Sequence, residues 1–298
     1  MSRLIDPRTL AALQNLPLLA KTVVDGFMTG YHQSLRRGAG MEFSQYKNYQ
    51  PGDDLRQLDW KMFARSDRYY IREAEVDTGI AVRFVVDTSA SMGHRDGTSG
   101  GISKLEYARF LVAALAHLAH TQGDAVGLFV LTDREGHLVN LTPRHDAVHR
   151  QRFWHQLERL QPAGRFPEPA ASGKLFAGKQ QKELTVFVSD WYEQEREISV
   201  LLGGLNARKN EVLCFHLMGR DEMDFAYQGN LTFEDLETGQ TVQVDATQLR
   251  KEYQEKVRLF LQTTREEMRK NQLAYQLLTL DQPLDEALRR FLTSRLRR

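Results

Sequence analysis

From residue 79 onward, short apolar runs alternate with segments of helical period. The runs lie at 81–86, 125–131, 184–188 and 212–217. Between the first two, residues 103–120 place apolar side chains at helical spacing. Strands that alternate with helices form parallel sheets covered on both faces, because each crossover helix packs on one face. The pattern predicts an α/β fold: a doubly wound, mostly parallel sheet with helices on both faces.

The rest of this region follows the same alternation. We expect helices over 144–160, 195–208 and 248–271, and a last helix from residue 284. The run 137–141 is expected to form a hairpin with 125–131, and 273–280 is a further strand. Residues 233–244 contain Glu237-Thr238-Gly239 between two short extended segments, which predicts a surface hairpin.

The first 75 residues have a different character. Asp6-Pro7 is a typical helix start, and a helical lead-in follows over 7–29. Residues 31–75 combine Gly, Pro, dense charge and many aromatic side chains, which is unlike a disordered linker. We therefore predict an irregular N-terminal subdomain over residues 1–75 and the sheet domain over 76–298.

Composition narrows the classes of function. The 298 residues carry 40 Lys and Arg against 39 Asp and Glu, so no global field favours nucleic acid as the partner. The basic C-terminus fits a solvated helix end. Cys214 is the only cysteine, so no internal disulfide forms. No segment has the apolar length of a membrane span or signal peptide. These features predict a cytoplasmic protein.

The run Asp87-Thr88-Ser89-Ala90-Ser91 directly follows the apolar run 81–86, and Asp190 ends another apolar run. Ligands bind at the carboxyl ends of strands in open α/β sheets, where the strand order reverses. If the two strands are neighbours there, their oxygen ligands converge on one crevice and suit a hard divalent cation. The predicted metal ligands are Asp87, Ser89, Ser91 and Asp190, and the metal is Mg²⁺, with Mn²⁺ or Ca²⁺ as alternatives.

Serine hydroxyls are neutral ligands and leave the cation partly electrophilic, so a partner's carboxylate could complete the shell. The structural alternative is that Asp87 and Ser89 only cap the following turn. A metal-dependent phosphoester hydrolase, with the cation as Lewis acid, is a competing class. Ser89 stands where a haloacid-dehalogenase-like phosphatase needs a second acid, and no nucleophile elbow is present. We therefore expect a non-catalytic protein; a metal-free structural scaffold is the third possibility.

A block of mixed charge around a tryptophan precedes the sheet. Its members are Asp53, Asp54, Arg56, Asp59, Trp60 and Arg65. Such charges can fix an irregular loop through Asp–backbone and Arg–carboxylate hydrogen bonds. They can also form a docking surface, because Arg and Trp are typical hot-spot residues.

Two motif sets carry a resemblance to known families. Asp87-Thr88-Ser89-Ala90-Ser91 and V-F-V-S-D at 186–190 resemble the metal-ion-dependent adhesion site of von Willebrand factor A domains. The blocks at 37–43, 49–60, 233–239 and 281–284 resemble the bacterial domain-of-unknown-function family 58, from about residue 35 to the C-terminus.

This resemblance implies a von Willebrand A-like sheet with the four ligands above. It also implies association with a MoxR-type AAA+ ATPase, as an adaptor or scaffold in protein assembly or maturation. One departure concerns the adhesion-site threonine, because the corresponding loop 163–167 has none. Ser172, Thr142 or a water would have to take its place.

Overall fold

The computed structural model describes residues 15–38, 46–48, 70–72, 79–97, 100–134, 137–169, 182–193, 195–207 and 210–295. The chain divides into two compact units, one of Met1–Phe27 with Ile80–Arg298 and one of Met28–Gly79. In the smaller unit, β1 (Tyr46–Asn48) pairs antiparallel with β2 (Tyr70–Arg72). From the sequence, residues 1–75 were predicted to form one subdomain. In the structure, the first half of α2 (Leu16–Gly38) belongs with the larger unit, where its apolar side chains are buried.

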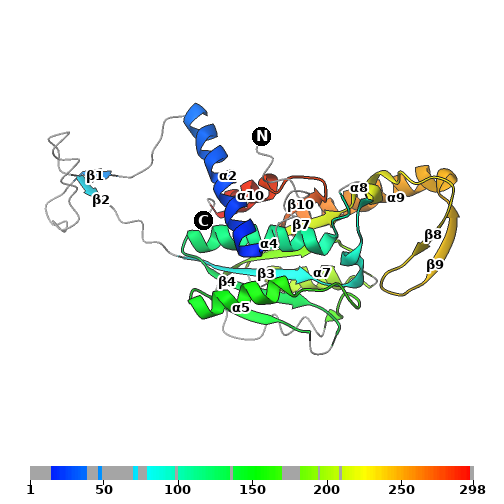
Figure 1. Ribbon diagram of the computed structural model, residues 1–298, viewed down its shortest axis with the longest axis horizontal. Coiled ribbons are helices and arrows are strands. Elements are labelled where there is room, and N and C mark those ends of the chain that lie inside the picture. The colour runs from blue at the N-terminus through cyan, green and yellow to red at the C-terminus, as the bar shows by residue number, and fades with distance from the viewer. Residues whose placement is uncertain are drawn as a thin grey trace. The chain divides into compact units, whose positions relative to one another are not determined.

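The larger unit is built on a six-stranded sheet (Figure 1). Its strands are β3 (Ala81–Asp87), β4 (Ala125–Leu131), β5 (Asn140–Arg144), β6 (Glu183–Ser189), β7 (Glu211–Met218) and β10 (Ala274–Thr279). They lie in the order β10-β7-β6-β3-β4-β5, and all neighbours are parallel except β4 and β5. The predicted α/β fold with a mostly parallel sheet is confirmed.

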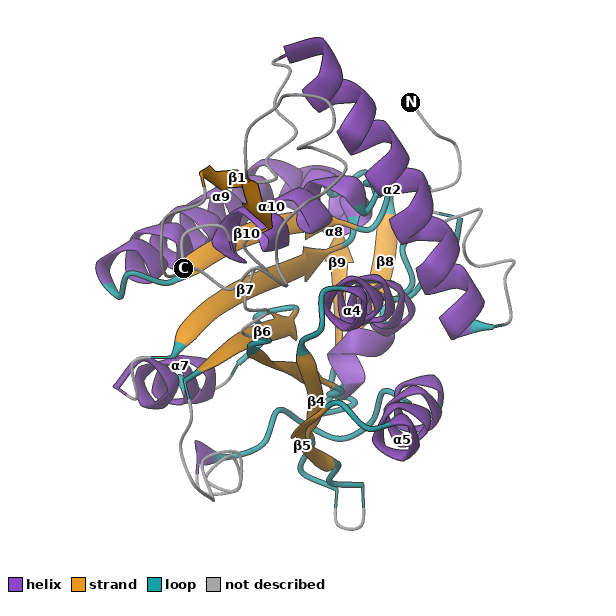
Figure 2. Cartoon of the chain, turned by 90° about the vertical axis from the view of Figure 1, so that its left-hand side faces the viewer, coloured by secondary structure: helices purple, strands orange, loops and turns teal. Residues whose placement is uncertain are grey.

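Helices cover both faces of this sheet (Figure 2). One face carries α4 (Lys104–Thr121), α5 (Ala147–Glu158) and α10 (Asp285–Arg295). The other carries α7 (Glu197–Ala207) and α9 (Ala246–Lys270). Smaller elements complete the unit: the 3₁₀ turn η3 (Ala90–Gly93), α8 (Arg220–Asp224), and the hairpin of β8 (Asn230–Glu234) and β9 (Thr241–Asp245).

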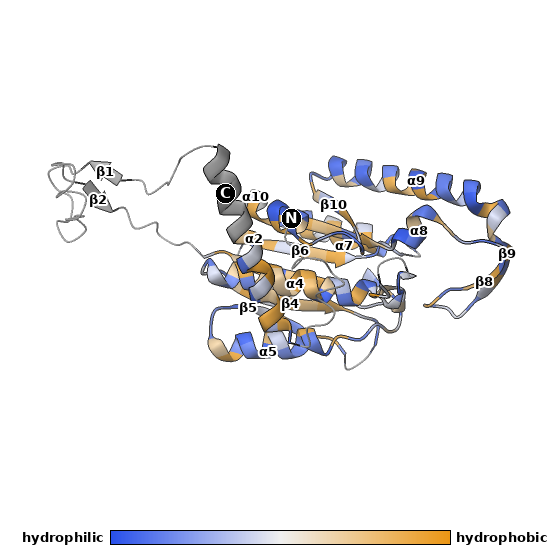
Figure 3. Ribbon diagram, turned by 45° about the horizontal axis from the view of Figure 1, so that its top comes forward, coloured by the Kyte–Doolittle hydropathy of each residue, from blue (hydrophilic) through white to orange (hydrophobic). Residues whose placement is uncertain are grey.

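The buried core follows from the alternation of side chains along each strand. Phe84 meets Phe153 of α5 on one face, with ring centroids 6.1 Å apart. Its neighbour Val85 points to the opposite face, where it belongs to a buried cluster with Phe187 and the fully buried Cys214. Apolar residues mark the strands and α4 in Figure 3, whereas α9 is largely hydrophilic. Within the described part of the chain, no helix has the length and apolar content that membrane crossing requires.

Gly127 in the middle of β4 should tolerate no side chain. A Cβ there would lie 2.5 Å from the backbone oxygen of Leu141 and 2.7 Å from the backbone nitrogen of Pro143, both on β5. Gly127→Ala should therefore force β5 away and lower the free energy of unfolding by about 2–3 kcal/mol. Gly203→Ala in α7 is the control, because a Cβ there meets nothing within 4 Å. Urea unfolding measures both; equal stabilities of the two variants would contradict this packing.

Candidate metal centre

Asp87 and the residue after β6, Asp190, lie at the same edge of the sheet. Their strands are direct parallel neighbours, with Val86 opposite Val188. Because β4 continues to one side of β3 and β7 to the other side of β6, this edge is the point where the strand order reverses. Both carboxylates are buried. The predicted convergence of the two aspartates is therefore confirmed.

Hydrogen bonds fix the Asp87 carboxylate from two directions. Its Oδ1 accepts the backbone N–H of Ser89 at 2.9 Å, and its Oδ2 accepts the hydroxyl of Ser189 at 2.7 Å. The hydroxyl oxygens of Ser89 and Ser91 lie 3.0 Å apart, and the Ser91 hydroxyl also interacts with Asp190. The structure thus brings together all four predicted ligands, and Ser189 is an additional contact that the motif did not identify.

Lys104, at the start of α4, is the main feature of the site that the sequence did not reveal. Its ammonium lies 2.9 Å from Oδ2 of Asp190 and 2.7 Å from Oε1 of Glu222. Ser103 and Glu106 form a capping box that fixes this first turn and hence the position of Lys104. Burial lowers the pKa of Lys104, but the charges of Asp190 and Glu222 outweigh burial and raise it above its usual range. Lys104 therefore remains a cation.

The two aspartates differ in their protonation. Burial, aided by the charge of Asp190, raises the pKa of Asp87 well above its usual range. Burial also acts to raise the pKa of Asp190, but the ammonium of Lys104 outweighs it and lowers that pKa. Asp190 is thus ionised and paired, whereas Asp87 is the member of the pair that takes up a proton when no other cation is present.

This donor set fits a hard divalent cation. The four groups supply only oxygen, from two carboxylates and two hydroxyls, which is the ligand type that Mg²⁺ prefers. The carboxylates of Asp87, Asp190 and Glu222 face a single ammonium, so the site carries an excess of negative charge when ionised. Buried charge of one sign requires a proton or a counter-ion.

The backbone immediately after Asp190 is held in a rare conformation. Trp191 has φ 60°, in the left-handed region that disfavours large side chains. Its N–H donates to the hydroxyl of Ser189 at 3.0 Å, and its ring stacks on His216 with centroids 5.0 Å apart. This packing keeps the strained turn in place, and the turn directs Asp190 toward the Asp87 loop.

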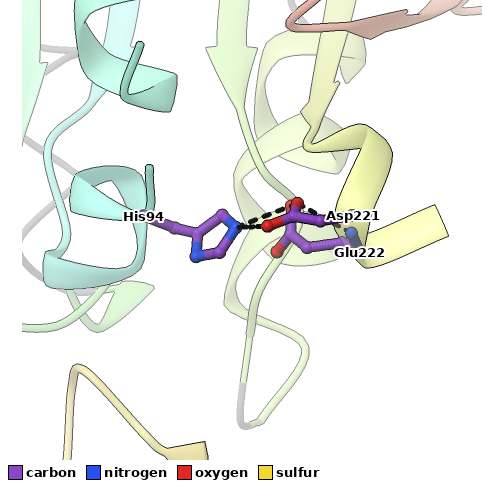
Figure 4. A group of neighbouring side chains, drawn as sticks. All are labelled: His94, Asp221 and Glu222. Carbon is purple, nitrogen blue, oxygen red and sulfur yellow. Dashed lines mark hydrogen bonds and ion pairs between the residues drawn. The ribbon is translucent and has the colours of Figure 1, made fainter. Parts of the chain in front are cut away.

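A second acidic group lies beside the site (Figure 4). Nε2 of His94 is 3.1 Å from Oδ2 of Asp221, and one potential ligand atom from each of His94, Asp221 and Glu222 lies within 4.8 Å of the others. These carboxylates already accept from protein donors: Asp221 from the hydroxyl of Tyr227 at 2.9 Å, and Glu222 from Lys104. The contact between His94 and Asp221 connects α8 to the loop that follows η3.

The loop that lacks the threonine contacts the Asp87 loop through its backbone. The N–H of Ala90 donates to the carbonyl oxygen of Gly164 at 2.9 Å, and the N–H of Ala163 donates to that of Thr88 at 2.8 Å. Thr142 lies beside Gly127 in the middle of β4, whereas Asp87 pairs with Leu131 at the end of that strand. Thr142 therefore cannot replace the threonine, and Ser172 lies outside the described residues.

The predicted docking block is not placed by the structure. Its members, Asp53, Asp54, Arg56, Asp59, Trp60 and Arg65, all lie outside the described residues. Their partner-binding role stays a prediction from the sequence.

A family model described as "Protein of unknown function DUF58" matches residues 45–261 of this chain. Two uncharacterized proteins, Mb1516 of Mycobacterium bovis and Rv1480 of Mycobacterium tuberculosis, are each 27% identical over 243 residues, covering 78% of this chain and 73% of theirs.

Three solved structures are also similar. A conserved hypothetical protein BatB from Bacteroides thetaiotaomicron has a TM-score of 0.47 at 13% identity, covering 74% of this chain and 100% of that one. An aerotolerance-related membrane protein from Bacteroides fragilis has a TM-score of 0.49 at 16% identity, again covering 74% of this chain and 100% of that one. An uncharacterized membrane spanning protein from Vibrio fischeri has a TM-score of 0.24 at 17% identity, covering 72% of this chain and 98% of that one.

The cytoplasmic location expected from the sequence does not agree with the descriptions of the last two proteins as membrane proteins, and it is not retained. It rested on a single cysteine and on the lack of a long apolar segment. Neither feature fixes where a folded domain resides, because a domain outside the bilayer has the same composition wherever its chain is attached.

Proposed function

The chain belongs to the DUF58 family of proteins of unknown function, and we propose that it is a non-catalytic, metal-dependent protein-interaction module. In this proposal Asp87, Ser89, Ser91 and Asp190 hold Mg²⁺ at the carboxyl edge of the sheet. The observation that carries it is the convergence of these oxygen donors in a buried site with excess negative charge.

We further propose that the sheet is von Willebrand A-like. Counted along the chain from β3, its strands lie in the order 3-2-1-4-5-6, and the third is an antiparallel edge strand. The Asp87 loop follows the first of these strands, at the switch point where this type of sheet binds ligands. The match in topology and in the position of the loop supports this assignment.

The cation would act as a bridge to a partner. A Mg²⁺ ion held by two serine hydroxyls and two carboxylates, one of them shared with Lys104, keeps affinity for a further acidic oxygen. Such a ligand would come from a MoxR-type AAA+ ATPase or from its client, as the family resemblance implies. Asp87 and Asp190 would hold the ion, and Lys104 would keep Asp190 ionised and oriented.

Mg²⁺ affinity should rise with pH. Burial raises the pKa of Asp87, so at acidic pH the ion must displace a proton from this carboxyl group. We expect weaker binding and proton release at pH 6, and stronger binding with little proton release at pH 8. Calorimetry in two buffers of different ionisation enthalpy measures both quantities. An affinity that is independent of pH would show that Asp87 does not bind the ion.

The interaction is tested with the purified protein and a purified MoxR-type ATPase from the same genome. We expect association in Mg²⁺, loss of association when EDTA is added, and recovery when excess Mg²⁺ is restored. Asp87→Asn should abolish association, whereas Glu266→Gln, which changes an exposed acid on α9, should not. Association that survives both EDTA and Asp87→Asn would rule out the metal bridge.

A metal-free structural scaffold is the second candidate. The ion pair of Lys104 with Asp190 favours it, because an internal ammonium already supplies one positive charge at the site. Elemental analysis of protein purified without chelator separates the two. One equivalent of a divalent metal supports the proposed module, and a well-folded protein that binds none supports the scaffold.

A further inference from the structure

The hairpin of β8 and β9 has a rigid tip. Oδ1 of Asp235 accepts the backbone N–H groups of Glu237 at 2.8 Å and Thr238 at 3.2 Å. The backbone N–H of Asp235 donates to the carbonyl oxygen of Gln240, and the N–H of Gly239 donates to the carbonyl oxygen of Asp235. Gly239 has φ 70°, a left-handed conformation that glycine adopts without strain. The backbone at Glu237 is therefore held by the turn itself.

Two contacts hold this hairpin at the carboxyl edge of the sheet, beyond which it lies in Figure 1. The hydroxyl of Tyr192 donates to Oδ2 of Asp235 at 3.0 Å, and the N–H of Tyr192 donates to Oδ1 of Asp190 at 3.2 Å. Close to the turn of the hairpin, Phe233 stacks on Phe225 with ring centroids 5.6 Å apart. One residue thus links the proposed metal ligand Asp190 to the hairpin tip.

The hairpin, the sheet edge and α9 line one open cavity. Its volume is about 700 Å³, and its walls include Ser91, Lys104 and Asp190 from the sheet side and Phe233, Asp235 and Leu236 from the hairpin. Two of the four proposed metal ligands thus line the same open cavity as residues of the hairpin.

Glu237 reaches the proposed ligands from this tip. Its carboxylate interacts with the hydroxyls of Ser91 and Ser89, and it experiences the charge of Asp190. Its Oε1 is buried and has no hydrogen-bond partner among the described residues. The side chain as a whole is partly buried, and this oxygen offers an acceptor to a cation beside it.

The charges favour a cation. Glu237 adds a fourth carboxylate to those of Asp87, Asp190 and Glu222. The ammonium of Lys104 pairs with Asp190 and Glu222. Among the described residues, Asp87 and Glu237 are therefore the two acids of the site that pair with no ammonium, and both lie beside the hydroxyls of the Ser89–Ser91 turn. A single divalent ion between them would neutralise both.

We propose that Glu237 ligates the cation of the Asp87–Asp190 site from within the chain, so that the hairpin tip occupies the place of a partner's acid until a partner displaces it. This inference rests on the proposed metal-binding function and adds an internal ligand to it. An acidic side chain on a partner would exchange with Glu237, and the hairpin would then swing away from Tyr192.

The test compares Mn²⁺ binding to the full chain in four forms: wild type, Glu237→Gln, Glu234→Gln and Asp87→Asn. Glu237→Gln should weaken Mn²⁺ binding roughly tenfold or more, since even outer-shell changes cost this much. Glu234→Gln is the matched control, because this acid lies on the same hairpin and lines the same cavity but is exposed; the affinity of this variant should equal that of wild type. Equal affinities of wild type and Glu237→Gln would overturn the inference.

A second readout follows the hairpin itself. Mn²⁺ should slow amide hydrogen exchange over residues 235–240 in wild type and in Glu234→Gln, and should leave it unchanged in Glu237→Gln. Protection of these amides in Glu237→Gln would also overturn the inference. The two proposals fail separately: if Asp87→Asn loses binding and Glu237→Gln keeps it, only the internal ligand is wrong. If Asp87→Asn binds Mn²⁺ like wild type, the metal site is wrong.

Discussion

Replacement of Lys104 by methionine is expected to lower the free energy of unfolding by about 3–5 kcal/mol, the usual cost of removing one partner of a buried ion pair. The ammonium is buried between Asp190 and Glu222, at 2.9 and 2.7 Å. Methionine retains the apolar stem of the side chain, so packing is largely preserved and the loss reports the charge. Urea unfolding in EDTA, followed by circular dichroism, measures the difference.

Lys256→Met is the control, because the Lys256 ammonium is exposed on α9 and pairs with the exposed Glu252. It should leave stability almost unchanged. Adding Mg²⁺ should restore part of the stability lost in Lys104→Met, since the ion supplies positive charge beside Asp190. A loss in Lys104→Met no larger than that in Lys256→Met would contradict the role given to this ion pair.

Asp87→Asn should have opposite effects on stability and on metal binding. A carboxyl group whose pKa is raised in the folded state stabilises the fold below its ordinary pKa, and this stability is lost as pH rises through the folded value. The metal-free wild type should therefore lose up to about 1.4 kcal/mol per pH unit over that range. Asparagine does not titrate, so the variant should lack this slope.

At pH 8 in EDTA, Asp87→Asn should consequently be more stable than wild type, and Mg²⁺ should stabilise only the wild type. Thermal unfolding at pH 5 and pH 8, with EDTA and with Mg²⁺, gives all the comparisons. A variant that is less stable than wild type at pH 8 without metal would mean that the Asp87 carboxylate is satisfied by its two hydrogen bonds alone.

Most of the sheet could be predicted from the sequence because its strands are short, uniformly apolar runs. The run 81–86 became β3 and the run 184–188 became β6, each with bounds shifted by one residue. General rules place the ligand-bearing loops of parallel strands at one edge of the sheet, and the adjacency of these two strands was a condition of the prediction that the structure meets. This is why Asp87 and Asp190 could be paired before their contacts were known.

The rest of the site depends on contacts between distant segments. Lys104 directly follows the helix cap Ser103, but its local sequence does not indicate that the first turn of the helix packs beside Asp190. Glu237 was placed in a hairpin turn, but the direction of that hairpin is set by Tyr192 and Phe225, which lie elsewhere in the chain. A lysine at the first position of a buried helix, facing a sheet edge rich in acids, is the one signal that could have identified Lys104.

The central claim is that Asp87, Ser89, Ser91 and Asp190 hold one divalent cation. Titration calorimetry with Mg²⁺ and with Mn²⁺, on the purified wild type beside Asp87→Asn, tests it most directly. The account predicts saturable binding of one ion per chain in wild type and no binding heat in the variant. Identical heats in the two proteins, or none in either, would contradict it.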